Sequence, residues 1–206
     1  KDYLVALGNI TLEAKEGIGN AGELFMAGGN ITLSDTDGDL INNAKLISVD
    51  GDITLNADKG QVKNEYAGDV FALNGNVTFH AKGDVINKGD VVALNGDNVT
   101  DKGAINFIST HGNVSNYDNF KLVDGSDFVF EDDKPKLVFN GASGYVIGSN
   151  AVVKFNQGTD YSKDGKYILT DADLAMKALE GYIYNDMAIV SNKDVTLVSG
   201  KDLTIG

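Results

Sequence analysis

Three aspartates alternate within one short polar stretch, Asp35-Thr36-Asp37-Gly38-Asp39. Carboxylates at alternate positions of a turn can converge on a hard cation such as calcium. The stretch lacks the distal glutamate and the other ligands of a calcium loop, so a solvated acidic corner is the alternative. Asp35, Asp37 and Asp39 are therefore a candidate calcium site, and no other cofactor is expected.

Candidates for catalysis are few. Asp132 and Asp133 are adjacent, and neighbouring residues on a strand point to opposite faces, whereas a glycosidase needs two carboxylates that flank one sugar. His80 and His111 have no serine or acid at a spacing that suggests a catalytic triad. The chain has no cysteine, and all of its 17 basic residues are lysine. We therefore expect no enzymatic activity.

The charge balance limits the partners. Thirty acidic residues against 17 lysines give a net charge of −13, which repels nucleic acid and anionic membrane surfaces. Glycine, asparagine or aspartate interrupts every apolar stretch, so no membrane insertion is expected. We expect a monomer that binds no nucleic acid and does not insert into a membrane.

A repeat explains most of the chain from residue 8 to residue 116. A unit of glycine, any residue, apolar, any residue, apolar starts at Gly8, Gly29, Gly51, Gly75 and Gly103, with spacings of 21, 22, 24 and 28 residues. Each of these glycines is followed by an apolar-x-Asn element whose asparagine lies twelve or thirteen residues further on, as in Leu40 to Asn42 and Val62 to Asn64. A third apolar segment precedes the next glycine, so each repeat carries three short segments.

The repeat predicts an all-β, right-handed parallel β-helix of about 22 residues per turn. Alternating apolar residues in the first segment indicate a half-buried strand, and three such short strands cannot enclose a core within one repeat. Successive turns must therefore stack in parallel. We expect one buried column of Ile10, Ile31, Ile53, Val77 and Ile105, and asparagines such as Asn42 and Asn64 stacked at a corner.

Other asparagines form Asn-x-Ser/Thr sequons, at Asn9, Asn30, Asn76, Asn98 and Asn113. Most of them coincide with the repeat consensus. We therefore expect strand and turn geometry to account for them, with glycosylation as the alternative.

The repeat is interrupted between residues 117 and 192. Thr170-Asp171-Ala172-Asp173 has the form of a helix start, and an apolar face that includes Leu174 and Leu179 follows, which predicts a short helix near 171–180. The expected organisation is thus regular turns over 1–116, an irregular or projecting segment over 117–192, and a resumed repeat over 193–206.

Eleven of the 17 aromatic residues fall in this interrupted segment. Aromatic side chains are enriched at recognition surfaces. They could also fill wider turns of the same solenoid, and that alternative stays open. The candidate binding surface consists of Tyr145, Tyr161, Tyr167, Tyr182 and Tyr184.

The units Gly-Asn-Ile-Thr-Leu at Gly29 and Gly-Asp-Ile-Thr-Leu-Asn-Ala at Gly51, followed by Val-x-Asn, resemble the filamentous haemagglutinin type of two-partner secretion exoprotein. The resemblance covers residues 8–116 and returns at Lys193-Asp194-Val195-Thr196-Leu197. The export domain of that family carries Asn-Pro motifs, whereas the one proline here, Pro135, follows Lys134. The resemblance implies an internal fragment of a large protein.

What the resemblance implies is a secreted adhesin segment at the surface of a Gram-negative-type bacterium. Its partners would be a protein or glycan on a host or neighbouring cell and, during export, an outer-membrane two-partner transporter. The alternative is a passive spacer that carries a contact-dependent inhibition toxin. A polysaccharide-acting β-helix enzyme is less favoured, because lyases of that fold depend on an arginine base.

Overall fold

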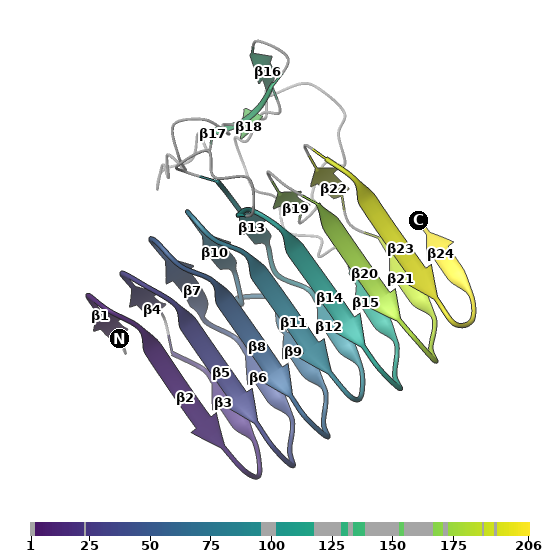
Figure 1. Ribbon diagram of the computed structural model, residues 1–206, viewed down its shortest axis with the longest axis horizontal. Coiled ribbons are helices and arrows are strands. Elements are labelled where there is room, and N and C mark those ends of the chain that lie inside the picture. Colours follow the sequence, from purple (N-terminus) through teal and green to yellow (C-terminus); the bar gives the residue numbers. More distant parts are fainter. Residues whose placement is uncertain are drawn as a thin grey trace.

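A computed structural model of the chain describes residues 3–22, 24–95, 102–117, 129–131, 134–138, 153–154, 167–170, 173–186, 188–191 and 193–206. Strands are the only regular elements in this part of the chain. The chain passes through three sheets in turn, which we call A, B and C, and then begins the next turn (Figure 1). The result is a β-solenoid.

Each of the three sheets has seven strands. Sheet A consists of β1 (Tyr3–Ala6), β4 (Leu24–Ala27), β7 (Lys45–Ser48), β10 (Val70–Ala72), β13 (Val91–Ala93), β19 (Tyr167–Thr170) and β22 (Ala188–Ser191). Sheet B consists of β2 (Ile10–Ala14), β5 (Ile31–Asp35), β8 (Ile53–Ala57), β11 (Val77–Ala81), β14 (Ile105–Ser109), β20 (Leu174–Ala178) and β23 (Val195–Ser199). Sheet C consists of β3 (Ile18–Asn20), β6 (Leu40–Asn42), β9 (Val62–Asn64), β12 (Val85–Asn87), β15 (Val114–Asn116), β21 (Ile183–Asn185) and β24 (Leu203–Ile205).

The predicted stacking is confirmed. All strand pairs within the three sheets are parallel, and the register of sheet B aligns Ile10, Ile31, Ile53, Val77 and Ile105 in one column. Every member of that column is buried, Ile53 completely. Similar residues stack because each strand pairs with its copy one turn away, about 4.8 Å along the axis.

The core runs along the axis and is shared by all three sheets. A second column of sheet B places Leu33, Leu55, Phe79 and Phe107 next to one another, all fully buried. The rings of Phe79 and Phe107 stack with their centroids 4.7 Å apart. Aromatic residues thus enter the core where the spacing between repeats lengthens.

The predicted helix near 171–180 is wrong. Residues Leu174–Ala178 form strand β20, which pairs in parallel with β14 on one side and β23 on the other. Leu174, Met176 and Ala178 are buried, whereas Ala175 and Lys177 point outward. This period of two belongs to a strand, and two neighbouring strands outweigh the local preference for a helix.

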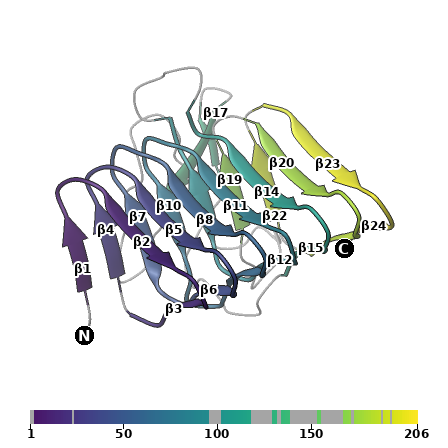
Figure 2. The same cartoon turned by 60° about the horizontal axis from the view of Figure 1, so that its bottom comes forward.

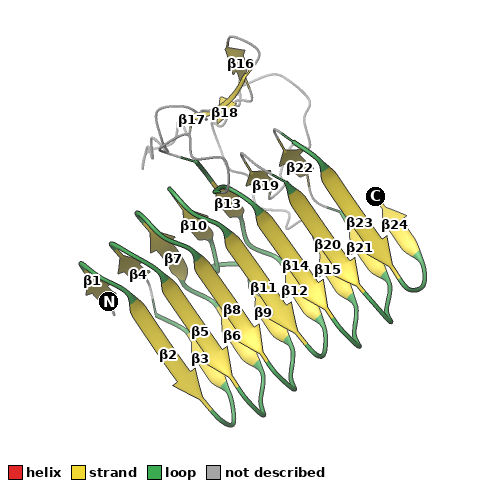
Figure 3. Ribbon diagram, viewed as in Figure 1, coloured by secondary structure: helices red, strands yellow, loops and turns green. Residues whose placement is uncertain are grey.

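The solenoid also resumes earlier than Lys193. Strands β19 to β22 take their places in sheets A, B and C ahead of β23, as the green and yellow ribbons show in Figure 2. A separate three-stranded sheet of β16 (Val129–Glu131), β17 (Lys134–Val138) and β18 (Val153–Lys154) lies outside the stack (Figure 3). Much of the predicted irregular segment lies outside the described residues.

Sheet A differs from the other two sheets in its outward face. Its outward column runs through Val5, Met26, Ile47, Phe71 and Val92, all of them apolar. The exposed fraction falls from 62% at Val5 to 0% at Val92. Strands that are apolar on both faces read as unbroken apolar runs, which explains the third segment of each repeat.

Candidate functional site

The structure does not bring Asp35, Asp37 and Asp39 together around one point. Asp35 ends β5 and is buried; its Oδ1 accepts the Gly38 amide, and its Oδ2 has no hydrogen-bond partner among the described residues. Asp37 forms an ion pair with Lys59 one turn away, and this hydrogen bond raises the pKa of Lys59. Asp35 thus bonds within its own turn, whereas Asp37 bonds to the next turn.

Asp39 shows the same pattern, because both of its oxygens are bound by Gln61 in the next turn. The Gln61 amide donates to Oδ1 and its side chain to Oδ2, each at 3.0 Å. Within the described residues no group of three histidine or acidic side chains could hold a metal ion. The acidic corner therefore connects neighbouring turns.

The two histidines occupy unrelated positions. His80 lies on the outward face of β11, where its Nδ1 is 2.8 Å from Asn56 Oδ1. His111 lies in a turn, with Nδ1 3.0 Å from Thr110 Oγ1 and Nε2 4.0 Å from Glu180. Asp132 and Asp133 lie outside the described residues.

Of the predicted binding tyrosines, Tyr182 and Tyr184 lie on the outer side of sheet C. Tyr182 precedes β21 and is 41% exposed, and Tyr184 is half-buried in the middle of that strand. Tyr167 begins β19 in sheet A, so it belongs to a different sheet. Tyr145 and Tyr161 lie outside the described residues.

The structure adds two tyrosines that the sequence did not single out. Tyr117 follows β15, and its ring centroid lies 5.3 Å from that of Tyr184. Tyr66 follows β9 and is 55% exposed, and Lys88 Nζ lies 5.3 Å from its ring centroid. We call the group Glu65, Tyr66, Lys88, Tyr117, Tyr184 and Asp186 the tyrosine ridge.

Backbone hydrogen bonds set the alignment of the ridge. The amide of Lys88 donates to Asn64 O, that of Tyr117 to Asn87 O, and that of Asp186 to Asn116 O. Each of these residues directly follows the asparagine that ends a strand of sheet C. Glu65, Lys88, Tyr117 and Asp186 therefore form one column along the solenoid axis.

Polar contacts fix the ridge side chains. Lys88 Nζ lies 2.8 Å from Glu65 Oε2, and the Tyr184 hydroxyl donates to Asp186 Oδ2 at 3.2 Å. Desolvation and then this hydrogen bond raise the pKa of the Tyr184 phenol. The surroundings therefore favour the neutral, hydrogen-donating phenol over the phenolate.

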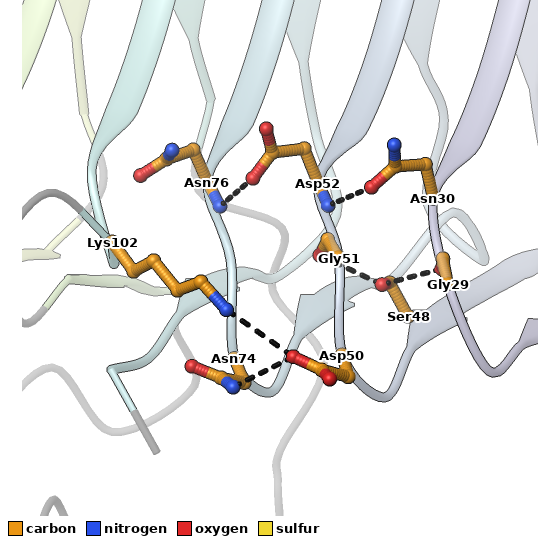
Figure 4. Close-up of polar contacts among 9 residues, drawn as sticks. All are labelled: Gly29, Asn30, Ser48, Asp50, Gly51, Asp52, Asn74, Asn76 and Lys102. Carbon is orange, nitrogen blue, oxygen red and sulfur yellow. Dashed lines mark hydrogen bonds and ion pairs between the residues drawn. The ribbon is translucent and has the colours of Figure 1, made fainter. Parts of the chain in front are cut away.

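The corner between sheets A and B carries another ordered row, shown in Figure 4. Asn30 Oδ1 accepts the Asp52 amide, and Asp52 Oδ1 accepts the Asn76 amide, both at 2.8 Å. Asn9 and Asn76 make the same contact with the turn that follows each. The sequon asparagines at this corner thus have the structural role expected from the repeat.

Side chains beside this row join three turns. Asp50 Oδ1 accepts from Asn74 Nδ2 at 2.8 Å and pairs with Lys102 Nζ at 3.2 Å (Figure 4). Ser48 Oγ is 2.9 Å from Gly29 O and 2.7 Å from Gly51 O. These contacts all stabilise stacking, which leaves the tyrosine ridge as the candidate interaction site.

No helix in the described part of the chain is long and apolar enough to cross a membrane. Comparison with protein-family models, with curated proteins and with solved structures gave no match.

Proposed function

We propose that the chain is a non-enzymatic segment of the shaft of a secreted bacterial surface adhesin, of the filamentous haemagglutinin type. The observation that carries the proposal is the single core shared by seven strands in each of three parallel sheets. Such a stack gains length by adding turns without changing its cross-section. This geometry suits a rod that extends outward from a cell.

The repeat resemblance supports an extracellular location and export through a two-partner transporter. Polar contacts join neighbouring turns at the acidic corner and at the corner between sheets A and B. This favours a structural role for those two surfaces. In this proposal, contact with a protein or glycan on a host or neighbouring cell occurs on a lateral surface of the rod.

The test is to couple the purified chain to beads and measure attachment to epithelial cells and to bacterial cells. We expect saturable attachment that the free chain competes away. Absence of attachment to either cell type would overturn the adhesive role and favour the spacer of a contact-dependent inhibition carrier, whose geometry would be the same.

A further inference from the structure

The tyrosine ridge runs along the solenoid axis. Its column advances from β9 through β12 and β15 to β21, which are consecutive neighbours in sheet C. At about 4.8 Å per turn, the column from Glu65 to Asp186 is about 14 Å long. A surface of this form fits an extended ligand that lies parallel to the solenoid axis.

The ridge presents both aromatic rings and oxygen acceptors. Tyr66 is 55% exposed, Tyr117 and Tyr184 are partly exposed, and Asp186 is exposed. The contacts of Lys88 with Glu65 and of Tyr184 with Asp186 restrain these side chains before any ligand arrives, so little entropy is lost on binding.

Charge and topology limit the class of ligand. The net charge of −13 disfavours anionic polymers, and the Lys88 ammonium is already in contact with Glu65 and Tyr66. An extended peptide binds most readily by adding to an open strand edge, but β9, β12, β15 and β21 are paired on both sides. The ridge therefore offers side-chain faces and acceptors instead of a backbone edge.

We propose that the tyrosine ridge binds an extended, uncharged polysaccharide along the solenoid axis. The proposal rests on the adhesive role proposed above and names the ligand class. A pyranose ring presents apolar C–H groups that pack on the aromatic faces, and its hydroxyl groups donate hydrogen bonds to the carboxylates of Asp186 and Glu65. Successive sugar units would meet Tyr66, Tyr117 and Tyr184 in turn.

The experiment measures binding of the purified chain to neutral β-glucan, mannan and galactan and to anionic heparan sulfate, by affinity electrophoresis. The variants are Tyr66→Ala and Tyr184→Ala. The control is Tyr3→Ala, because Tyr3 is 56% exposed but lies in sheet A, away from the ridge. Thermal melting checks the fold of each variant.

We expect binding to a neutral glycan, weakened by about tenfold in each ridge variant and unchanged in Tyr3→Ala and at raised salt. Binding to heparan sulfate alone, binding to none of the glycans, or equal binding by wild type and Tyr66→Ala would overturn the proposal. If Tyr184→Ala has a lowered melting temperature, the test depends on the comparison of wild type with Tyr66→Ala, because Tyr66 is exposed. Cell attachment that is unchanged in both ridge variants would support the adhesive role and contradict only the proposed binding at the tyrosine ridge.

Discussion

The asparagine column of sheet C shows how one residue type can specify a corner. Asn20, Asn42, Asn64, Asn87, Asn116 and Asn185 each occupy the last position of a strand and are buried. Each side-chain nitrogen in the column, up to Asn116, donates to the side-chain oxygen one turn on, at 2.6 to 2.9 Å. The chain of bonds satisfies buried polar groups that would otherwise destabilise the core.

Asn64→Ala tests this column. The substitution removes a donor to Asn87 Oδ1 and an acceptor for Asn42 Nδ2, both at 2.8 Å, so each of these buried partners loses one hydrogen bond. We expect the free energy of unfolding to fall by about 1 kcal/mol in a urea titration. The control is Asn43→Ala, an exposed neighbour, which should change it by less than about 0.5 kcal/mol. Equal changes in the two variants would contradict a stabilising role of the asparagine column.

Tyr184 gives a prediction on pH. Its phenol has a raised pKa, so in the folded chain it should ionise after a phenol of ordinary pKa. The neutral form is the one favoured by folding, and the stability that Tyr184 adds is therefore present below the unfolded pKa and lost as the pH rises through the folded one. Ultraviolet titration of phenolate should show that Tyr184→Phe loses a component that ionises above the ordinary pH range of tyrosine. An unchanged titration above that range would contradict the raised pKa of Tyr184.

At the scale of elements, glycines let the corners of successive turns approach closely. A Cβ on Gly75 would lie 2.0 Å from the carbonyl oxygen of Gly51 in the preceding turn. A Cβ on Gly19, within β3, would meet nothing within 4 Å. Close backbone approach, and not a turn conformation, is thus the reason for glycine at the start of this repeat.

Gly75→Ala should therefore lower the free energy of unfolding by about 1–3 kcal/mol, because the backbone of two turns must move apart. Gly19→Ala is the matched control, with a predicted change near zero or slightly stabilising. Chemical denaturation of the two variants provides the measurement. A neutral Gly75→Ala would mean that the corner has room to relax.

Strand β20 shows where local sequence was insufficient. Leu174, Ala175, Ala178 and Leu179 match a helical face, while Leu174, Met176 and Ala178 match a strand equally well. The unit Ile183-Tyr184-Asn185 distinguishes the two, because it repeats the apolar-x-Asn element of the earlier turns. This signal is hard to see in the sequence, because 69 residues separate Asn185 from Asn116, far more than in any earlier turn.

Substitutions in β20 distinguish strand from helix. Met176 is fully buried, so Met176→Asp should cost on the order of 4 kcal/mol, whereas Ala175→Asp on the outward side should cost about 1 kcal/mol or less. A helix with the predicted face would reverse the order, since Ala175 would be buried and Met176 would not. The melting temperatures of the two variants distinguish the strand from the helix.

At the scale of the whole molecule, the regular turns are predictable because the offset from glycine to asparagine within each repeat stays at twelve or thirteen residues, although the spacing between repeats grows from 21 to 28. The inward columns of sheets B and C and the parallel pairing follow from that constant offset. The tyrosine ridge was not predictable, because it depends on the alignment of Tyr117 with Asp186 across the long interruption of the repeat. The outward apolar face of sheet A likewise requires knowing which side of each short strand faces the core.

The stack also determines how far the effect of a core substitution extends, because the strands of each turn pair only with those of the neighbouring turns. Ile53 lies in the middle of the regular turns, fully buried between Ile31 and Val77. Ile53→Asp places an unpaired carboxylate in the core, at a cost on the order of 4 kcal/mol. In a one-dimensional array, the loss should be largest at the turn that carries the charge and at the turns on either side.

Hydrogen exchange followed by mass spectrometry separates a local effect from a global one. In Ile53→Asp we expect the amides of β5, β8 and β11 to lose protection, while those of β20, β21 and β23 keep most of theirs. Ile53→Val, which keeps the site apolar, is the control and should leave the pattern unchanged. Uniform loss of protection from β2 to β23 would show instead that all the turns unfold as one cooperative unit, and that coupling along the axis exceeds the cost of a buried charge.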